Sequence, residues 1–154
     1  MRPSSRSGEV DDPERGSAAL EFILVGVVLL VPVLYLVVAL GMIQAQSLGA
    51  EAAARHIARA ISTADGATDA GARADAVLDA VVREYGMDAE RVQVSIACAP
   101  AVVPCPAPGA TVVVSLRTTV PLPFAPSVLG LDRVAAVPVE ASAVQKVSRL
   151  WGAP

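Results

Sequence analysis

The chain is poor in several residue types that most soluble domains use freely. Aromatic residues make up only 3% of its 154 residues, and Lys146 and His56 are its single lysine and single histidine. The arginines are scattered and the net charge is −3. The sequence therefore lacks the clustered basic residues and interleaved aromatics that nucleic-acid binding requires, and we expect no nucleic-acid partner.

Residues that carry catalysis or bind metals are also scarce. No nucleophile motif accompanies His56, so we interpret it as a solvated or packed helix residue. Cys98 and Cys105 do not form a zinc pattern with one distant histidine, and their spacing is not the C-x-x-C of redox pairs. Asp75 and Asp79 share a helix face with nearby arginines, which is typical of a solvated surface. We therefore predict no enzyme, no cofactor and no metal site.

The chain has an excess of aliphatic residues, much of it in one run. Hydrophobic residues make up 54% of the sequence and the mean hydropathy is +0.56. Phe22 to Ile43 contains no charged residue, and only Gly26, Pro32 and Gly41 interrupt it. A helix of about 20 apolar residues spans the hydrocarbon core of a bilayer, and a proline is tolerated there. We predict one membrane-spanning helix over residues 17–43.

A secretory signal peptide is the alternative interpretation of this run. Signal peptides have an apolar part of about 7–15 residues behind a positively charged stretch. Here the run is longer, and residues 1–16 mix four acidic residues with three arginines. This polar, serine- and proline-containing segment is expected to be disordered. Arginine counts are similar on both sides of the span, so the positive-inside rule leaves its orientation open.

A helix is expected to continue beyond the span through the alanine-rich stretch from Gln44 to Ile61. Glu51, Arg55 and Arg59 stand four residues apart on a solvated face. Asp65-Gly66 is expected to end the helix, because glycine suits a left-handed cap. Another side of the helix carries residues that a neighbouring helix can approach closely: Ala50, Ala53, Ala54, Ile57 and Ile61.

A second helix is predicted from about Asp69 to Tyr85, with Gly86 as its stop. Its apolar residues recur at steps of three and four and form one stripe: Ala70, Ala74, Val77, Leu78, Val81, Val82 and Tyr85. An amphipathic helix of this kind needs a surface on which to lie.

Three segments with period-two alternation follow and predict strands: residues 92–98, 111–120 and 137–144. Pro138 indicates that the last is an edge strand, because proline cannot donate to a ladder. The predicted fold class is α+β. A long transmembrane helix leads into a second, amphipathic helix, which packs on a small three-stranded antiparallel sheet.

Cys98 and Cys105 enclose a short loop between the first two predicted strands. A disulfide is the favoured interpretation, and two unpaired, half-buried thiols are the alternative. A bridge across so short a loop adds on the order of 2–3 kcal/mol and forms in an oxidising compartment. The disulfide would place the head, residues 44–154, outside the cytoplasm.

Glu21 lies at the boundary of the apolar run. A charge near the centre of a bilayer costs roughly 2.5–3.5 kcal/mol on insertion scales, and an ionisable residue within a span is a functional candidate. At the boundary the cost is smaller, and the carboxylate can reach headgroups and water. The residues alone leave two interpretations of Glu21 equally open: a functional carboxylate, or one that only reaches headgroups and water.

The segment "RGSAALEF", residues 15–22, resembles the processing site of type IV pilin-like proteins. The shared features are a polar leader that ends in glycine, a glutamate at the fifth mature position and an aromatic residue after it. Residues 14–61 resemble the TadE-like proteins, minor pseudopilins of the tight-adherence (Flp) pilus system. Actinobacterial members are especially similar, including the cysteine pair and the segment "VPLPFAPSVLG".

This resemblance implies that a prepilin peptidase removes residues 1–16 as a leader on the cytoplasmic side. Gly16 then precedes the cut, Ser17 becomes the first residue, and Glu21 and Phe22 become the fifth and sixth. The mature chain would be a single-pass protein of the cytoplasmic membrane with an extracytoplasmic head. Its partners would be other pilins or pseudopilins and the pilus assembly machinery, and it would act in pilus assembly or surface adhesion.

Cleavage also explains the position of Glu21. It creates an ammonium group at Ser17, one helical turn before Glu21, which can pair with its own carboxylate or with that of an adjacent subunit. Such a pair fixes the register between helices more than it adds stability. Two alternatives remain: a single-pass anchored envelope protein that binds a partner and is unrelated to pili, and a secreted soluble domain.

Overall fold

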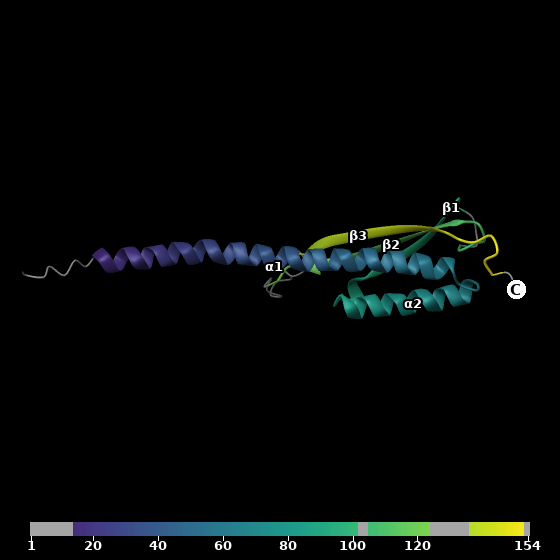
Figure 1. Cartoon of the computed structure of the whole chain (residues 1–154), viewed down its shortest axis with the longest axis horizontal. Helices are drawn as coiled ribbons and strands as arrows, with labels where there is room; N and C mark the ends of the chain where they lie inside the picture. The colour runs from purple at the N-terminus through teal and green to yellow at the C-terminus, as the bar shows by residue number, and fades with distance from the viewer. Residues whose placement is uncertain (1–13, 102–104, 124–135, 153–154) are drawn as a thin grey trace, which may run out of the picture. The chain divides into compact units, whose positions relative to one another are not determined.

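The computed structural model describes residues 14–101, 105–123 and 136–152. Its elements, in order, are α1 (Glu14–Ser62), α2 (Ala67–Glu84), the short 3-10 helix η1 (Ala89–Arg91), β1 (Gln93–Ala99), β2 (Thr111–Pro121) and β3 (Ala136–Lys146) (Figure 1). The predicted α+β class, with two helices and a three-stranded antiparallel sheet, is confirmed. By internal contacts the chain divides into two units, residues 1–37 and 38–154.

α1 begins earlier than the sequence indicated. It starts at Glu14, so the last three residues of the expected leader, up to Gly16, are helical rather than disordered. The segment from Glu14 to Ala19 contains no proline or second glycine that would stop a helix from growing back from the apolar run. The expected disorder of residues 1–13 lies outside the described residues.

In the first unit, α1 exposes nearly all of its large apolar side chains. Phe22 is 80% exposed and Leu30 is 66% exposed. Helix geometry continues through Pro32 without a break. A contiguous apolar surface of this extent is not stable against water on a monomeric protein. By length and composition, the helix is able to cross a membrane, as expected for a single-pass anchor.

In the second unit, the remainder of α1 is a core helix. In Figure 1 it lies between α2 and the sheet, and all three contribute to one hydrophobic cluster. The residues expected to face a neighbouring helix are buried, with exposures of 0–2%: Ala50, Ala53, Ala54, Ile57 and Ile61. The sequence indicated only α2 as the cover of the sheet. In the structure α1 also covers the sheet. Its stripe of buried residues is wide enough to contact both α2 and the sheet.

The end of α1 differs from the expectation. The helix stops at Ser62, and the Ser62 hydroxyl donates to the backbone oxygen of Arg59 at 2.9 Å. The Thr63 hydroxyl donates to the same oxygen at 3.0 Å. The backbone N–H of Thr63 also donates to it, at 3.1 Å, so this carbonyl has its partners without a glycine cap. Gly66, with φ of +128°, is instead the N-cap of α2.

α2 ends at its predicted glycine. Gly86 has φ of +60°, and the N–H of Met87 donates to the carbonyl of Val82 at 2.9 Å. This is the long bond of a Schellman motif, in which glycine occupies the left-handed position. The Gln46 side chain donates to the Tyr85 carbonyl at 3.2 Å, so the end of α2 is attached to α1.

Gly49 of α1 lies against Tyr85 and Met87, which follow the end of α2. A Cβ atom at this position would lie 2.7 Å from Cγ of Tyr85 and 3.0 Å from Cε of Met87. Because Gly49 is inside a helix, where alanine is normally preferred, packing is the reason that glycine fits here. No sequence pattern marks this residue.

We expect Gly49→Ala to destabilise the head by about 1–3 kcal/mol, because the added methyl group forces Tyr85 out of its place. Gly71→Ala is the matched control, since a Cβ at Gly71 meets nothing within 4 Å. The control should be neutral or stabilising by up to about 1 kcal/mol. Denaturant unfolding of the full chain in detergent measures both. Equal stability of the two variants would contradict the close packing at Gly49.

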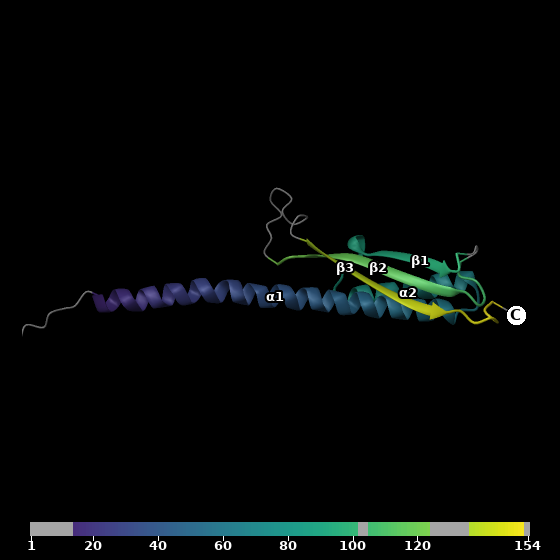
Figure 2. The same ribbon diagram turned by 90° about the horizontal axis from the view of Figure 1, so that it is seen from above.

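The sheet has the order β1-β2-β3, with both pairs antiparallel (Figure 2). β1 runs one residue later than predicted at each end, and β2 and β3 extend slightly beyond their predicted limits. The central strand supplies the core face, where Val112, Val114 and Leu116 are fully buried. Pro138 lies in β3, which is an edge strand as predicted.

Candidate functional site

The expected processing segment lies at the beginning of α1. Gly16 and Ser17 are in its first turns, and Glu21 follows Ser17 by four residues. At a rise of 1.5 Å per residue, the Cα atoms of Ser17 and Glu21 are about 6 Å apart along the axis. Glu21 and Phe22 are both exposed. The side chains of Glu21 and Phe22 therefore both lie on the surface of the apolar segment.

Glu21 is the only Asp, Glu, Lys or Arg between residues 19 and 50. Within the described part of the chain, no hydrogen bond or ion pair reaches its carboxylate. Residues 1–16 precede Ser17 in this chain, so the nitrogen of Ser17 is an amide and carries no charge. The ammonium proposed as the partner of Glu21 would exist only after cleavage between Gly16 and Ser17.

The two cysteines form the predicted disulfide. Cys98 lies near the end of β1 and Cys105 lies in the connection to β2, and their Cα atoms are 5.8 Å apart. Cys98 is half-buried and Cys105 is exposed. The bridge closes the β1–β2 connection. Two unpaired thiols, the alternative left open by the sequence, do not describe this structure.

The remaining candidates stay apart from one another. His56 is exposed on α1 and lines a shallow groove of about 400 Å³ with Val77, Val81 and Glu84 of α2. Asp75 and Asp79 are exposed on α2. Across the described residues, no group of three or more His, Cys, Asp or Glu side chains is arranged to hold a metal ion.

One carboxylate in the first turn of α2 has a shifted pKa. The backbone N–H of Asp65 donates to the Asp69 carboxylate at 2.9 Å, and Arg73 lies 2.7 Å from it. The hydrogen bond from Asp65 is the main reason that the pKa of Asp69 lies below its usual value, and Arg73 adds to the effect. This cluster is exposed and stabilises the turn, so we assign it a structural role.

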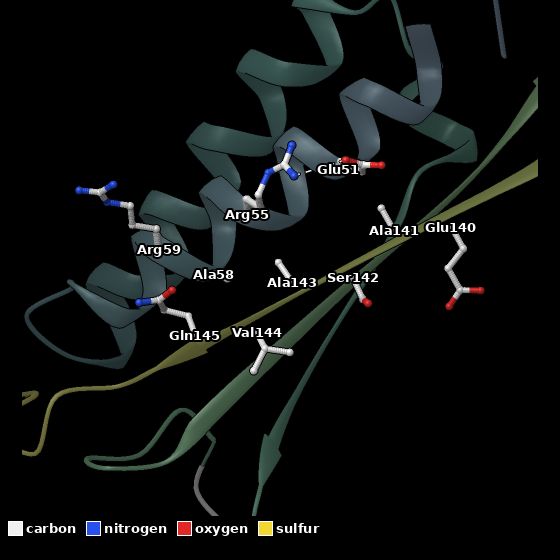
Figure 3. Close-up of a pocket in the computed structure, with 10 residues that line it drawn as sticks. All are labelled: Glu51, Arg55, Ala58, Arg59, Glu140, Ala141, Ser142, Ala143, Val144 and Gln145. Carbon is white, nitrogen blue, oxygen red and sulfur yellow. Dashed lines mark hydrogen bonds and ion pairs between the residues drawn. The ribbon is translucent and has the colours of Figure 1, made fainter. Parts of the chain in front are cut away.

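A larger groove, of about 700 Å³, lies between α1 and β3 (Figure 3). Its lining residues are Glu51, Arg55, Ala58 and Arg59 of α1 and Glu140, Ala141, Ser142, Ala143, Val144 and Gln145 of β3. From the sequence, the charged residues of α1 were expected to form only a solvated face, and nothing in their spacing indicated this groove. Each wall of the groove had its own sequence signal. The α1 wall carries the ladder of Glu51, Arg55 and Arg59, and the β3 wall was marked as an edge strand by Pro138.

Comparisons of the chain with protein-family models, with curated proteins and with solved structures find no significant match.

Proposed function

We propose that this protein is a TadE-like minor pseudopilin, processed by a prepilin peptidase and acting in assembly of a tight-adherence pilus or in surface adhesion. The observation that carries the proposal is the character of α1. One helix joins an exposed apolar segment to a buried core segment, and its single acidic residue in the apolar part is Glu21. That residue stands five positions after Gly16, as the resemblance of residues 15–22 to pilin processing sites requires.

Cleavage has a simple physical route in this segment. The peptide bond between Gly16 and Ser17 lies near the helix end, where backbone N–H groups lack intrahelical partners and the helix frays. Gly16 weakens the helix there by roughly 0.5–1 kcal/mol relative to alanine. Local unwinding at the cut therefore costs little, while the apolar helix that follows stays formed. The mature N-terminus then carries the charge that neutralises Glu21.

The head would lie on the outer side of the cytoplasmic membrane. The disulfide between Cys98 and Cys105 supports this orientation, because such bridges persist in oxidising compartments. Partners would be the peptidase, other pilins or pseudopilins and the assembly machinery, with the lipid bilayer around the span. An anchored envelope protein unrelated to pili is the alternative, and it differs by keeping its first sixteen residues.

Replacing Gly16 by leucine is expected to abolish leader removal. The bulky side chain both stabilises the helix at the cut and fills a position where the resemblance requires glycine. Intact-mass spectrometry of the native protein measures the outcome. The wild-type chain should begin at Ser17, and the variant should begin at Met1.

Gly26→Ala is the matched control, since Gly26 lies in the same helix and an added Cβ there meets nothing within 4 Å. It should be processed as the wild type is. A wild-type chain that begins at Met1, or after the apolar segment, would refute the proposed function.

A further inference from the structure

β3 has one edge that does not pair with β2. Just beyond the strand, the N–H of Val147 donates to the carbonyl of Ala110 at 2.9 Å, and this pair continues the register in which Thr111 faces Lys146. Bonded and non-bonded pairs alternate along an antiparallel ladder. Odd-numbered residues of β3 therefore bond to β2, and even-numbered residues direct their N–H and C=O groups away from it. Pro138, which has no N–H, is even-numbered.

The outward groups of Glu140, Ser142 and Val144 open on to the groove beside α1. Six consecutive residues, Glu140–Gln145, line it. A cavity over one face of a sheet would be lined by alternate residues of a strand. Because consecutive residues line this groove, it runs along the free backbone edge of β3. Within the described ranges, no residue donates to or accepts from these outward groups. Unpaired edges of this kind are templates for another strand.

The opposite wall of the groove has an asymmetric charge. Arg55 is paired with Glu51 at 3.3 Å, whereas the Arg59 guanidinium has no hydrogen bond or ion pair with any described residue. In Figure 3, Arg59 and Gln145 lie toward one end of the groove, and Glu51 and Glu140 lie toward the other. One end therefore offers an available positive charge. The two carboxylates at the other end are both paired, Glu51 with Arg55 and Glu140 with Arg117 at 3.0 Å.

We propose that this groove binds an extended segment of a partner polypeptide, which pairs with the free edge of β3 and places a carboxylate beside Arg59. The backbone bonds to Glu140, Ser142 and Val144 would supply affinity, and the charge on Arg59 would set which segments bind and in which position. An uncharged residue fits the end beside Glu51, because the carboxylates of Glu51 and Glu140 are already paired with arginines. This inference rests on the head alone and does not depend on the pilus assignment.

Fluorescence anisotropy of labelled peptides tests the proposal on the full chain in detergent, with its disulfide intact. The probes are two strand-forming peptides of alternating threonine and valine, one with a glutamate near its N-terminus and one with it near its C-terminus. Their controls carry lysine in place of glutamate. At least one acidic probe should bind about tenfold or more tightly than its lysine control.

Two variants address the two parts of the site. Val144→Pro removes an outward N–H at a position equivalent to that of Pro138 and spares the bonds to β2, so it should abolish binding. Arg59→Glu should reverse the preference, so that the lysine probe binds better. Arg83→Glu, an exposed charge reversal on α2, is the control and should change nothing. If Val144→Pro unfolds the head, the proposal is tested by Arg59→Glu alone, through the reversed preference between the acidic and lysine probes.

Equal binding of acidic and basic probes, or no binding of either, would overturn the proposal. Unchanged preference in Arg59→Glu would overturn it as well. A chain that binds no probe but self-associates in a way that Val144→Pro disrupts would also refute it, because the occupant would then be a second copy.

Discussion

Glu21→Ala is expected to leave the protein in the membrane and to stop it from assembling with its partners. Removing a charge makes the apolar segment easier to insert, so membrane fractionation should recover the variant like the wild type. After cleavage, however, the Ser17 ammonium would have no carboxylate to pair with at the edge of the lipid. Breaking one partner of a buried ion pair costs on the order of 3 kcal/mol, or about a hundredfold in association.

Three measurements separate the outcomes for this variant: membrane fractionation, the mass of the N-terminus, and cross-linking of native complexes. Glu90→Ala is the matched control, because it removes an exposed glutamate from η1 and should assemble normally. Loss of assembly in Glu21→Ala with normal membrane recovery supports the pairing of Ser17 and Glu21. Complex formation at the wild-type level would show that the carboxylate only reaches headgroups and water.

Ile57→Ala is expected to cause the largest loss of stability in the head. Ile57 is 1% exposed and lies on the part of α1 that packs between α2 and the sheet. Truncating a buried isoleucine to alanine removes its packing on both sides and leaves a cavity. Such changes cost about 2–5 kcal/mol. Because natural domains have total stabilities of only about 5–15 kcal/mol, the variant should be close to unfolding at physiological temperature.

Trp151 provides the measurement, since it is the only tryptophan in the chain. Its indole N–H donates to the carbonyl of Ile61 at 3.0 Å, one turn beyond Ile57. Its fluorescence during denaturant unfolding therefore reports on the packing of this part of α1. Leu48→Ala is the control, because Leu48 is 58% exposed on the same helix and should change the unfolding free energy by less than about 0.5 kcal/mol. If both variants unfold at the same denaturant concentration, Ile57 is not a core residue.

Local patterns predicted most of the elements. The period of 3.6 identified the stripe of α2 from Ala70 to Tyr85, and the period of two identified all three strands to within about two residues. These patterns were readable because α2, β2 and β3 each turn one face to the core, and burial imposes the period of the element on the sequence. β1 alternates in sequence but is largely exposed, with Ile96 at 45%. The edge position of Pro138 was predictable for a similar reason, since a missing N–H is tolerated only on a free edge.

Turns and close contacts were less predictable. Gly66 was expected to cap the end of α1, yet it caps the start of α2. α1 already ends at Ser62, where the Arg59 carbonyl accepts the Thr63 N–H and the hydroxyls of Ser62 and Thr63. Gly49 had no sequence signal, since a helical glycine is informative only when the neighbouring helix is known. Tyr85, which occupies the space beside it, is 36 residues away in the chain.

The sequence by itself determined the apolar helix, the position of Glu21 four residues after Ser17, the stripe of α2 and the alternation of the strands. Each of these depends on neighbours within a few residues, where helix and strand geometry leave little freedom. Only the tertiary structure decided that α1 is covered on two sides, that Gly49 packs against Tyr85, and that Arg59 and the free edge of β3 line one groove. These features join segments far apart in the chain, and packing of whole elements, rather than local backbone preference, brings them together.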